Sequence, residues 1–571
     1  MISSVLALPL LLQSIPYDGV TLFSPMSQND VFLVDNSGAT VHTWPGSHLP
    51  GLSVYLTEDY DLVRTNRVAT GQLPAGHGGG LQRMDWNGNV LWDYQYYSPS
   101  QHLQHHDIEV LPNGNILLIA WKWKTRQEAI NVGRNPAYLN SSSSYSFLPD
   151  HIAELQPVGT GGANIVWEWN VWDHLIQDFD PTKPNYGVIA NYPERVNINY
   201  PPLVPSGDWT HLNTVSYNEE LDQVMLTSRH FSELWIIDHS TTTAEAAGST
   251  GGNYGVGGDL LYRWGNAEAY GRGTPADKEL FSPHDAIWIA PNRMGAGNII
   301  VFDNGLNRPA GPYSTVDEIA PPITAAGDYS ISPGAPYGPV TTTWEYIDPV
   351  PTNFYSPSIS GCERLPNDNT LICSGDQAWI FEVDPAGNIV WEYFNTIPNP
   401  ANSRVFKARR YGVTDSPQSQ CEGTGAGIAC PCGNNGGPGE GCANSTGQGA
   451  VLTSSGAPRI LSDSLALQIT QGTISQPVLF FQGNNAINGG NGNAFGDGIR
   501  CCGGAVKRLQ VRFMNASGSA TSTTSISLAG ATSVGDVRCY QGWYRDPSGS
   551  SGSPCGNSFN LTNGLTLTWV P

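Results

Sequence analysis

The chain has 571 residues, which is too long for one ordinary hydrophobic core and predicts two domains. Its formal net charge is −22, with 27 basic against 49 acidic residues, and this argues against nucleic acid or an anionic membrane surface as the main partner. Glycine, proline, tryptophan and tyrosine are plentiful and no segment has heptad character, so the composition is typical of an all-β protein.

The chain begins with an apolar segment, residues 2–12, that is too short to span a bilayer. It has the length of the hydrophobic region of a secretory signal, although no lysine or arginine precedes it. We therefore predict a signal peptide over residues 1–15 and a secreted or periplasmic protein. No later stretch is apolar enough to predict a membrane span.

An internal repeat follows, and it is clearest at a strand that ends on tryptophan. Apolar residues alternate with period 2 between Gly, Asn and Pro, which predicts short strands, and self-similarity every few tens of residues predicts an array or propeller. Two or three strand-like runs precede most copies, so one repeat has the make-up of a four-stranded blade. The six copies of the tryptophan strand are residues 38–44, 88–92, 163–169, 258–264, 340–344 and 387–391.

The first repeat is one strand short. Residues 20–23, 31–35 and 39–44 give three strands with none before them. The run 404–410, at the far end of the repeats, could supply the missing inner strand and so remove an open sheet edge. The sequence therefore predicts a six-bladed β-propeller over residues 16–411.

The chain has ten cysteines, a number that is consistent with an exported, disulfide-containing protein. Cys362 and Cys373 flank the turn of one predicted hairpin and could bridge across it. The other eight lie in the last third, where two closely spaced pairs make zinc the alternative. No histidine occurs in that part of the chain, and an even count in an exported protein favours disulfides. The eight are Cys421, Cys430, Cys432, Cys442, Cys501, Cys502, Cys539 and Cys555.

The composition changes after Tyr411. Residues 412–449 are rich in Gly, Asn and Ser and carry four cysteines, which is typical of a stapled linker or small knot. Strand-like runs separated by Gly and Ser then predict a small disulfide-rich β-sandwich over residues 450–571. One of these runs is residues 524–528. The aromatic residues Tyr540, Trp543 and Tyr544 belong either to a packed core strand or to a platform for extracellular carbohydrate or matrix.

Three histidines occupy the same place in successive repeats. His106, His211 and His284 each stand just ahead of an apolar run. The first strand of each propeller blade lines the axial channel, so the three imidazoles would face one another across the axis. Asn213 lies on the same face of its strand as His211, and Arg229 ends the next strand.

Further polar residues take similar positions in later repeats, namely Asn304, Ser358 and Ser360. Imidazoles, a guanidinium and carboxamides that converge on one point form a pocket for a tetrahedral oxyanion. Imidazole can also accept a transferred group. Three histidines can hold zinc, but the charge of Arg229 would repel a dication, so we expect no metal and no cofactor.

Several stretches, taken together, resemble the aryl-sulfate sulfotransferase family. The resemblance covers roughly residues 18–411 and implies a six-bladed propeller that moves a sulfuryl group from a small aryl sulfate to a phenol without a nucleotide donor. The stretches are Gln104-His-His-Asp-Ile-Glu-Val-Leu-Pro-Asn-Gly-Asn-Ile-Leu-Leu118, Trp172-Asp-His-Leu-Ile-Gln-Asp-Phe-Asp180, Trp209-Thr-His-Leu-Asn-Thr-Val215, Leu226-Thr-Ser-Arg229, His284-Asp-Ala286, Phe302-Asp-Asn-Gly305 and Arg364-Leu-Pro-Asn-Asp-Asn-Thr-Leu371.

The same resemblance implies roles for individual residues. His284 would be the nucleophile of a ping-pong mechanism and would carry a transient sulfohistidine. His106, His211, Asn213 and Arg229 would bind the sulfuryl oxygens and the charge that develops on the phenolate, and either His106 or His211 would act as the acid and base.

Two other functions stay open at this point. One is a non-catalytic exported binding or matrix propeller. The other is a propeller hydrolase or lyase that acts on sulfated or acidic glycans, which would need a facing pair of carboxylates. Asp107, Asp285 and Asp303 could supply that pair.

Overall fold

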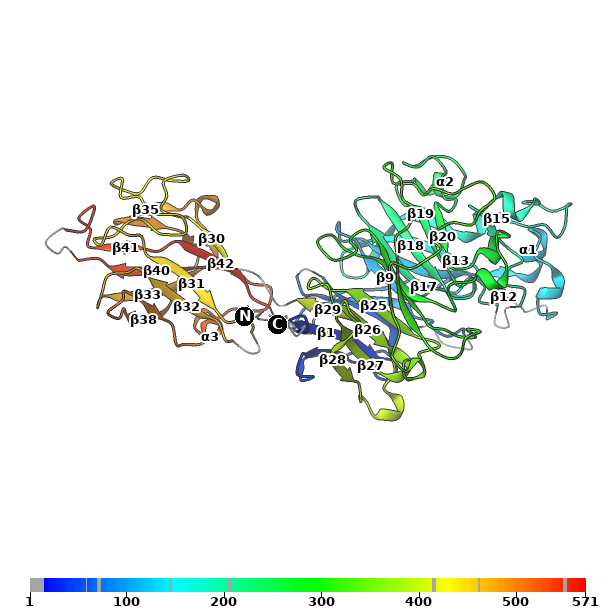
Figure 1. Ribbon diagram of the computed structural model, residues 1–571, viewed down its shortest axis with the longest axis horizontal. Coiled ribbons are helices and arrows are strands. Elements are labelled where there is room, and N and C mark those ends of the chain that lie inside the picture. The colour runs from blue at the N-terminus through cyan, green and yellow to red at the C-terminus, as the bar shows by residue number, and fades with distance from the viewer. Residues whose placement is uncertain are drawn as a thin grey trace, which may run out of the picture. The chain divides into compact units, whose positions relative to one another are not determined.

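A computed structural model describes residues 15–57, 59–68, 73–142, 146–203, 207–412, 417–460, 463–547 and 552–570. Residues 1–14 of the predicted signal peptide lie outside this part. The described chain is almost entirely β-structure and divides into two compact units, residues 1–411 and 412–571 (Figure 1). None of the helices described is long and apolar enough to cross a membrane.

Over its described residues, the first unit contains six antiparallel sheets of four or five strands. The first comprises β29 (Val405–Gly412), β1 (Gly19–Pro25), β2 (Val31–Asp35) and β3 (Thr40–Trp44). The second comprises β4 (Pro50–Leu56), β5 (Leu62–Arg67), β6 (Gly79–Met84) and β7 (Val90–Gln95). The third runs from β14 (Gly162–Asn170) through β13 (Asp150–Val158), β10 (Ile116–Lys122) and β9 (His102–Val110) to β8 (Tyr97–Ser98).

The other three sheets follow in chain order. The fourth comprises β17 (Leu212–Asn218), β18 (Gln223–Ser228), β19 (Glu233–Asp238) and β20 (Tyr262–Trp264). The fifth comprises β21 (His284–Trp288), β22 (Ile299–Asp303), β23 (Thr315–Ile319) and β24 (Trp344–Tyr346). The sixth comprises β25 (Ser360–Arg364), β26 (Thr370–Ser374), β27 (Trp379–Val383) and β28 (Ile389–Phe394).

Short elements fill the connections between these sheets. Two α-helices are described there, α1 (Arg126–Asn131) and α2 (Thr243–Ala246). Both begin with a capping box, in which the side chains of a threonine and a glutamate each accept a hydrogen bond from the backbone N–H of the other residue. Two small ladders pair β11 (Lys124–Thr125) with β12 (Ser146–Phe147) and β15 (Leu175–Ile176) with β16 (Val196–Asn197).

The tryptophan of each repeat joins its sheet to the next one. Every one of the six indole N–H groups donates to a backbone carbonyl of the following sheet, or of the segment that leads to its outer strand. The sixth bond returns to the first sheet, so the series closes on itself. The pairs are Trp44 to Asp85, Trp92 to Gly162, Trp169 to Gly258, Trp264 to Pro339, Trp344 to Pro385 and Trp391 to Asn36, at 2.7 to 3.0 Å.

The inner strands also pack side by side. β4 contacts β9, β9 contacts β17, β17 contacts β21 and β21 contacts β25. β29 completes the series, because Arg410 N–H donates to the Glu363 carboxylate of β25 and the Tyr411 hydroxyl accepts from Leu56 N–H of β4. The last strand of the unit thus lies beside β1 in the first sheet, which is the pairing predicted from the sequence.

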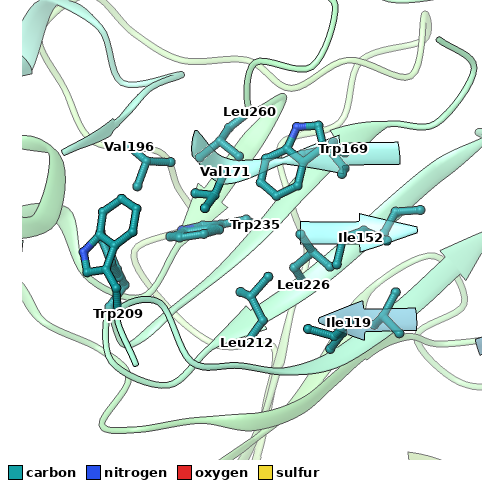
Figure 2. Close-up of a cluster of buried hydrophobic side chains, with 14 of the residues drawn as sticks. Ile119, Ile152, Trp169, Val171, Val196, Trp209, Leu212, Leu226, Trp235 and Leu260 are labelled. Atoms are coloured by element: carbon teal, nitrogen blue, oxygen red, sulfur yellow. The ribbon is translucent and has the colours of Figure 1, made fainter. Parts of the chain in front are cut away.

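The hydrophobic core lies between neighbouring sheets. Figure 2 shows the contact between the third and fourth sheets, where Ile119 and Ile152 meet Leu226 and Trp235. All four side chains are fully buried. Because each sheet buries apolar residues on both faces, burial fixes the spacing of the inner strands and of the polar groups that they carry.

The second unit places two sheets on one core. The larger sheet contains β30 (Gln418–Gln420), β42 (Gly564–Thr568), β40 (Val537–Arg545), β33 (Pro477–Gly483) and β38 (Lys507–Phe513), with β41 (Phe559–Leu561) beside β40. The smaller contains β31 (Val451–Ser455), β32 (Ala466–Thr470) and β39 (Ala520–Thr521). Leu467 and Ile469 of the small sheet share a buried cluster with Phe480 and Tyr540 of the large one. Two more ladders pair β34 (Asn485–Ala486) with β37 (Cys502–Gly503) and β35 (Asn493–Phe495) with β36 (Gly498–Arg500).

Four disulfides hold the second unit, and they use all eight of its cysteines. They link Cys421 to Cys501, Cys430 to Cys442, Cys432 to Cys555 and Cys502 to Cys539. The glycine-rich segment that was predicted as a linker or knot is therefore tied to the sheets of this unit.

The predicted bridge between Cys362 and Cys373 is wrong. Both are free and buried. Cys362 lies opposite Ile372, and Cys373 lies opposite Gly361, so the two cysteines are out of step by one residue. Successive strand residues point to opposite faces, and the two thiols therefore belong to different buried clusters.

Two other expectations change in the second unit. Residues 524–528 do not form a strand, because Ser525 caps α3 (Ile526–Gly530) by accepting from Leu528 N–H. The predicted aromatic cluster is split between the two faces of β40. Tyr540 and Tyr544 are buried in the core, whereas Trp543 is half-buried on the other face.

Candidate active site

The three predicted histidines lie where β-bulges interrupt the inner strands. β9, β17 and β21 each change register at or beside the histidine. The backbone is left-handed at His106, His211 and Asp285, with φ of 52°, 47° and 55°. A bulge leaves a residue out of the ladder and re-aims its side chain, and strained backbone of this kind clusters at functional sites.

The bulges bring the three imidazoles into one buried region. The ring centroids of His106 and His211 are 4.6 Å apart. Phe406 of β29 lies against both His106 and His284, at 5.9 and 6.0 Å between ring centroids. The three histidines come from the third, fourth and fifth sheets. Phe406, on the strand that completes the first sheet, contacts two of them.

Hydrogen bonding fixes the tautomer of His284. Its Nδ1 lies 2.7 Å from Oδ1 of Asn304, and the Asn304 amide nitrogen donates to the Ser356 carbonyl. Oδ1 is thus the accepting end, so Nδ1 carries the proton and Nε2 keeps its lone pair. Burial, together with the charge of Arg229, lowers the pKa of His284 to about 3. The ring is neutral at pH 7, as a nucleophile requires.

A carboxylate stands behind His211. The Asp208 carboxylate accepts from Nδ1–H of His211 across 2.5 Å and from the Trp121 indole across 2.8 Å. Burial, followed by the charges of His230 and Arg229, holds the pKa of His211 well below its usual range. The imidazole therefore presents an unprotonated Nε2, and Asp208 can stabilise the imidazolium if that nitrogen takes a proton.

His106 is backed by a second histidine. Its Nδ1 lies 2.8 Å from Nδ1 of His105, whose Nε2 lies 2.7 Å from Asp150. Asp150 also accepts from the Thr210 hydroxyl and from Leu212 N–H, so it joins the third sheet to the fourth. Burial lowers the pKa of His106 well below its usual range.

Gly76 leaves room for the His106 ring. Its carbonyl accepts from His106 N–H at 2.9 Å, and its φ is 89°. A Cβ at this position would lie 2.0 Å from Cε1 of His106. Both the backbone conformation and the space therefore require glycine.

Arg229 supplies positive charge beside the histidines. It lies close enough to all three for its charge to lower their pKa values. Within the described part of the chain, its guanidinium makes no hydrogen bond or ion pair. An unpaired guanidinium next to neutral imidazoles is suited to bind an anion.

The other predicted polar residues differ in their relation to the histidines. Asn213 donates to the Pro283 carbonyl at 2.8 Å and so ties the His211 strand to the His284 strand. Ser360 donates to Oδ1 of Asn304 at 3.2 Å and thus lies one contact from His284. Ser358 instead binds the Asp376 carboxylate and Arg404. Its described contacts include none of the three histidines.

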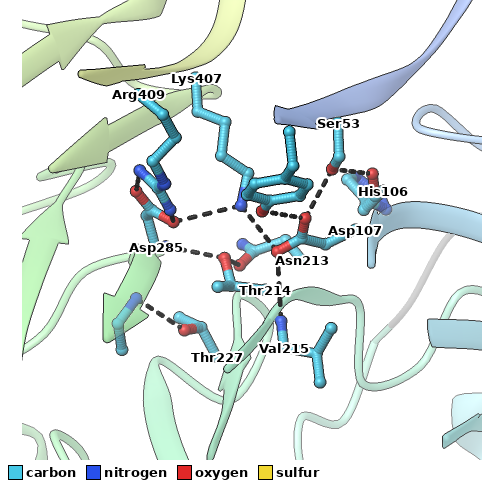
Figure 3. A network of polar contacts seen from close by, with 12 residues as sticks. Ser53, His106, Asp107, Asn213, Thr214, Val215, Thr227, Asp285, Lys407 and Arg409 are labelled. Carbon is cyan, nitrogen blue, oxygen red and sulfur yellow. Dashed lines mark hydrogen bonds and ion pairs between the residues drawn. The ribbon is translucent and has the colours of Figure 1, made fainter. Parts of the chain in front are cut away.

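Two carboxylates that follow the histidines hold a buried ion network (Figure 3). Lys407 of β29 lies 2.6 Å from Asp107 and 3.2 Å from Asp285, and Arg409 pairs with Asp285 at 2.6 Å. Burial alone would raise the pKa of Asp285, but the charges of Arg409 and Lys407 hold it well below its usual range.

The same carboxylates bond backbone N–H groups of neighbouring sheets. Asp107 accepts from Val215 N–H of β17, and Asp285 accepts from Cys362 N–H of β25. These two aspartates were candidates for hydrolytic acids on the sequence, but each already has structural partners. Asp303 likewise accepts from Arg308 and from Phe281 N–H. No observation favours a free carboxylate pair among them.

Among the residues that the structure describes, no three or more His, Cys, Asp or Glu side chains are arranged to hold a metal ion. Arg229 adds positive charge at the same place.

The sequence profile of the family described as Arylsulfotransferase (ASST) matches residues 18–409, which is more than half of the chain. The chain therefore belongs to the arylsulfotransferase family. One relative is the arylsulfate sulfotransferase AssT of Escherichia coli O6:H1 (strain CFT073), which is 24% identical over 371 residues. The match covers 56% of this chain and 53% of that protein, so the chain spans about half the length of this relative.

Solved structures give only distant likenesses. A protein of unknown function from Bacteroides caccae is 11% identical, with a TM-score of 0.37, over 69% of this chain and 98% of that one. Virginiamycin B lyase from Staphylococcus aureus is 12% identical, with a TM-score of 0.31, over 67% of this chain and 83% of that one. Scores this low carry no argument about function.

Proposed function

We propose that this protein transfers a sulfuryl group from an aryl sulfate to a phenolic acceptor by a ping-pong mechanism through sulfohistidine at position 284. The observation that carries the proposal is the state of His284. Its Nδ1–H is committed to Asn304, so Nε2 is the ring nitrogen that keeps a lone pair for attack. Membership of the arylsulfotransferase family supports the reaction class.

In the first half-reaction, the Nε2 lone pair of His284 attacks sulfur, and the bond from sulfur to the aryl oxygen breaks. The phenolate leaves with the bonding electron pair. Arg229 binds the sulfuryl oxygens, and Asn304 accepts a stronger hydrogen bond from Nδ1–H as the ring gains positive charge. Removing one group that stabilises such charge typically costs roughly 10²–10³ in rate.

In the second half-reaction, a phenol replaces the departed phenolate. We assign His211 as the base, because Asp208 lies 2.5 Å behind it and would stabilise the imidazolium. Nε2 of His211 takes the phenol proton, the phenol oxygen attacks sulfur, and the bond from sulfur to nitrogen breaks. The electron pair returns to His284, and the sulfated phenol leaves.

The test is an assay with p-nitrophenyl sulfate in the presence and absence of phenol. Transfer predicts release of nitrophenolate that depends on phenol and is lost in a His284→Ala variant. Release that needs only water would indicate a sulfatase. If no aryl sulfate reacts at all, a non-catalytic binding propeller is the better account.

We further propose that the six sheets are the blades of a closed six-bladed propeller. The series of indole hydrogen bonds supports this, since it passes through all six sheets and returns to the first. The four disulfides of the second unit support a secreted or periplasmic location.

For the second unit, we propose that an aromatic face contacts extracellular carbohydrate. Trp543 meets Phe495 and Phe559 at 5.8 and 5.6 Å between ring centroids, on the sheet face away from the core. Trp543 and Phe495 border a groove of about 160 Å³ that is also lined by Arg500 and Arg508. Sedimentation of the protein with insoluble polysaccharides, lost in Trp543→Ala, would support this contact. Equal sedimentation of the variant would exclude this face.

A further inference from the structure

A cavity of about 330 Å³ opens beside the proposed anion-binding guanidinium. Its lining includes Arg229 and the neighbouring His230, whose ring centroid lies 4.7 Å from that of His211. Ser282, two residues before His284, lines it as well. The cavity therefore adjoins Arg229 and lies one side chain away from His211, and a substrate whose sulfuryl group sits at Arg229 would have room for its remainder here.

Lys278 gives this cavity a second cation. The ammonium group lies 5.1 Å from the Phe281 ring. Over the described residues it makes no ion pair or hydrogen bond, and burial lowers its pKa. The nearby carboxylate of Asp303 already accepts from Arg308 and from two backbone N–H groups. Glu268 and Glu233 also attract Lys278 through their charge, but among the described residues no carboxylate forms an ion pair with this half-buried ammonium group.

Apolar side chains form part of the remaining wall, next to the polar residues Ser232 and Asn307. Phe281, Leu306 and Leu203 line the cavity, and Leu203 is 72% exposed. An aromatic ring placed against these side chains would bury apolar surface on both partners. The cavity therefore combines two separated cations with a surface suited to one ring.

We propose that this cavity binds the aryl part of a substrate that carries a second anionic substituent, with that substituent paired to Lys278. The substrate class is an aryl sulfate bearing a carboxylate, or another sulfate, remote from the ester that reacts. The assignment rests on the proposed sulfuryl transfer. It adds to that proposal the charge of a second substituent on the substrate ring. Lys278 acts as a specificity residue and takes no part in bond making.

The experiment compares 4-sulfooxybenzoate with its methyl ester, which has the same ring without the second charge. Dissociation constants for both are measured by calorimetry in a His284→Ala background, and kcat/KM in the otherwise unchanged protein. Lys278→Met should reduce the preference for the acid over the ester by about tenfold or more, as expected for a lost charge-assisted bond. Lys183→Met, which removes a lysine outside the cavity, should leave the preference unchanged.

The two readouts separate the two proposals. If the ratio of the dissociation constants of the acid and the ester is the same in Lys278→Met as in the parent protein, the assignment of Lys278 is overturned. If Lys278→Met changes that ratio of dissociation constants but neither compound is turned over by the parent protein, the binding site is supported and sulfuryl transfer is overturned. Lys278→Arg, which keeps the charge, should retain the preference. Its thermal unfolding, and that of Lys278→Met, should match the parent.

Discussion

For single residues, the proposed chemistry depends on which ring nitrogens carry protons. Asn304 decides that Nδ1 of His284 is protonated, and burial keeps the ring neutral. The sequence could predict the three histidines because they recur at one place in a repeat. It could not predict His105 or Asp150, because their role arises from contacts between strands about 45 residues apart.

An Asn304→Asp variant tests this proton assignment. The carboxylate still accepts from Nδ1–H, but its negative charge favours the protonated ring and raises the pKa of His284 above about 3. Activity needs the neutral ring, so it is present above that pKa and lost as pH falls through it. The acid limb of kcat/KM should therefore move to higher pH in the variant.

The control for that experiment is Asn304→Leu, which removes the acceptor without adding charge. We expect transfer to fall by about 10- to 100-fold, the usual cost of losing a supporting partner. If the acid limb of Asn304→Asp coincides with that of the parent protein, His284 is not the titrating nucleophile.

Spacing along the chain does not decide an outcome that depends on residue parity or on a competing partner. Cys362 and Cys373 flank one hairpin, yet the register separates them onto opposite faces. Ser358 stands in the predicted position, but Asp376 and Arg404 engage its hydroxyl. Neither the register of a hairpin nor the partner of a hydroxyl can be read from spacing alone.

At the scale of elements, β29 has two roles. It supplies the missing strand of the first sheet, and it also carries Phe406 and Lys407 into the centre of the unit. The first role was predictable, because the first repeat lacked a strand. The second was not, because the sequence does not reveal which aspartates a lysine about 120 or 300 residues away will meet.

A Lys407→Met variant tests the structural importance of this strand. Asp107 would remain buried without its cation, and breaking a buried ion pair typically costs about 3–5 kcal/mol. The free energy of unfolding, measured with denaturant, should fall by about that amount. Adding Asp107→Asn should recover most of the loss, because the uncompensated charge is then gone. A single variant as stable as the parent would show that the network contributes little.

For the whole molecule, the two units are stabilised by different kinds of interaction. The first relies on apolar contact between sheets and has two free buried cysteines over its described residues. The second, with fewer residues, relies on four disulfides. One of these joins residues 123 apart, which in a chain-entropy account contributes about 5 kcal/mol. The change in composition made this division predictable, but the pairing of eight cysteines was not.

Mild reduction should therefore affect the two units unequally. With dithiothreitol, calorimetry should show one thermal transition moving to lower temperature while another stays in place. Transfer activity below both transitions should remain unchanged, because the histidine cluster contains no disulfide. Loss of activity in parallel with thiol release would contradict this separation of roles.

Sulfuryl transfer by the proposed mechanism requires a bond between sulfur and Nε2 of His284. The most direct measurement is mass spectrometry of the protein after brief incubation with p-nitrophenyl sulfate and no acceptor, followed by digestion at alkaline pH, where a sulfohistidine is best preserved. We expect one added SO₃ group on the peptide that contains His284, removed when phenol is supplied and absent from His284→Ala. An active protein whose sulfuryl group is found on another residue, or on none, would contradict it.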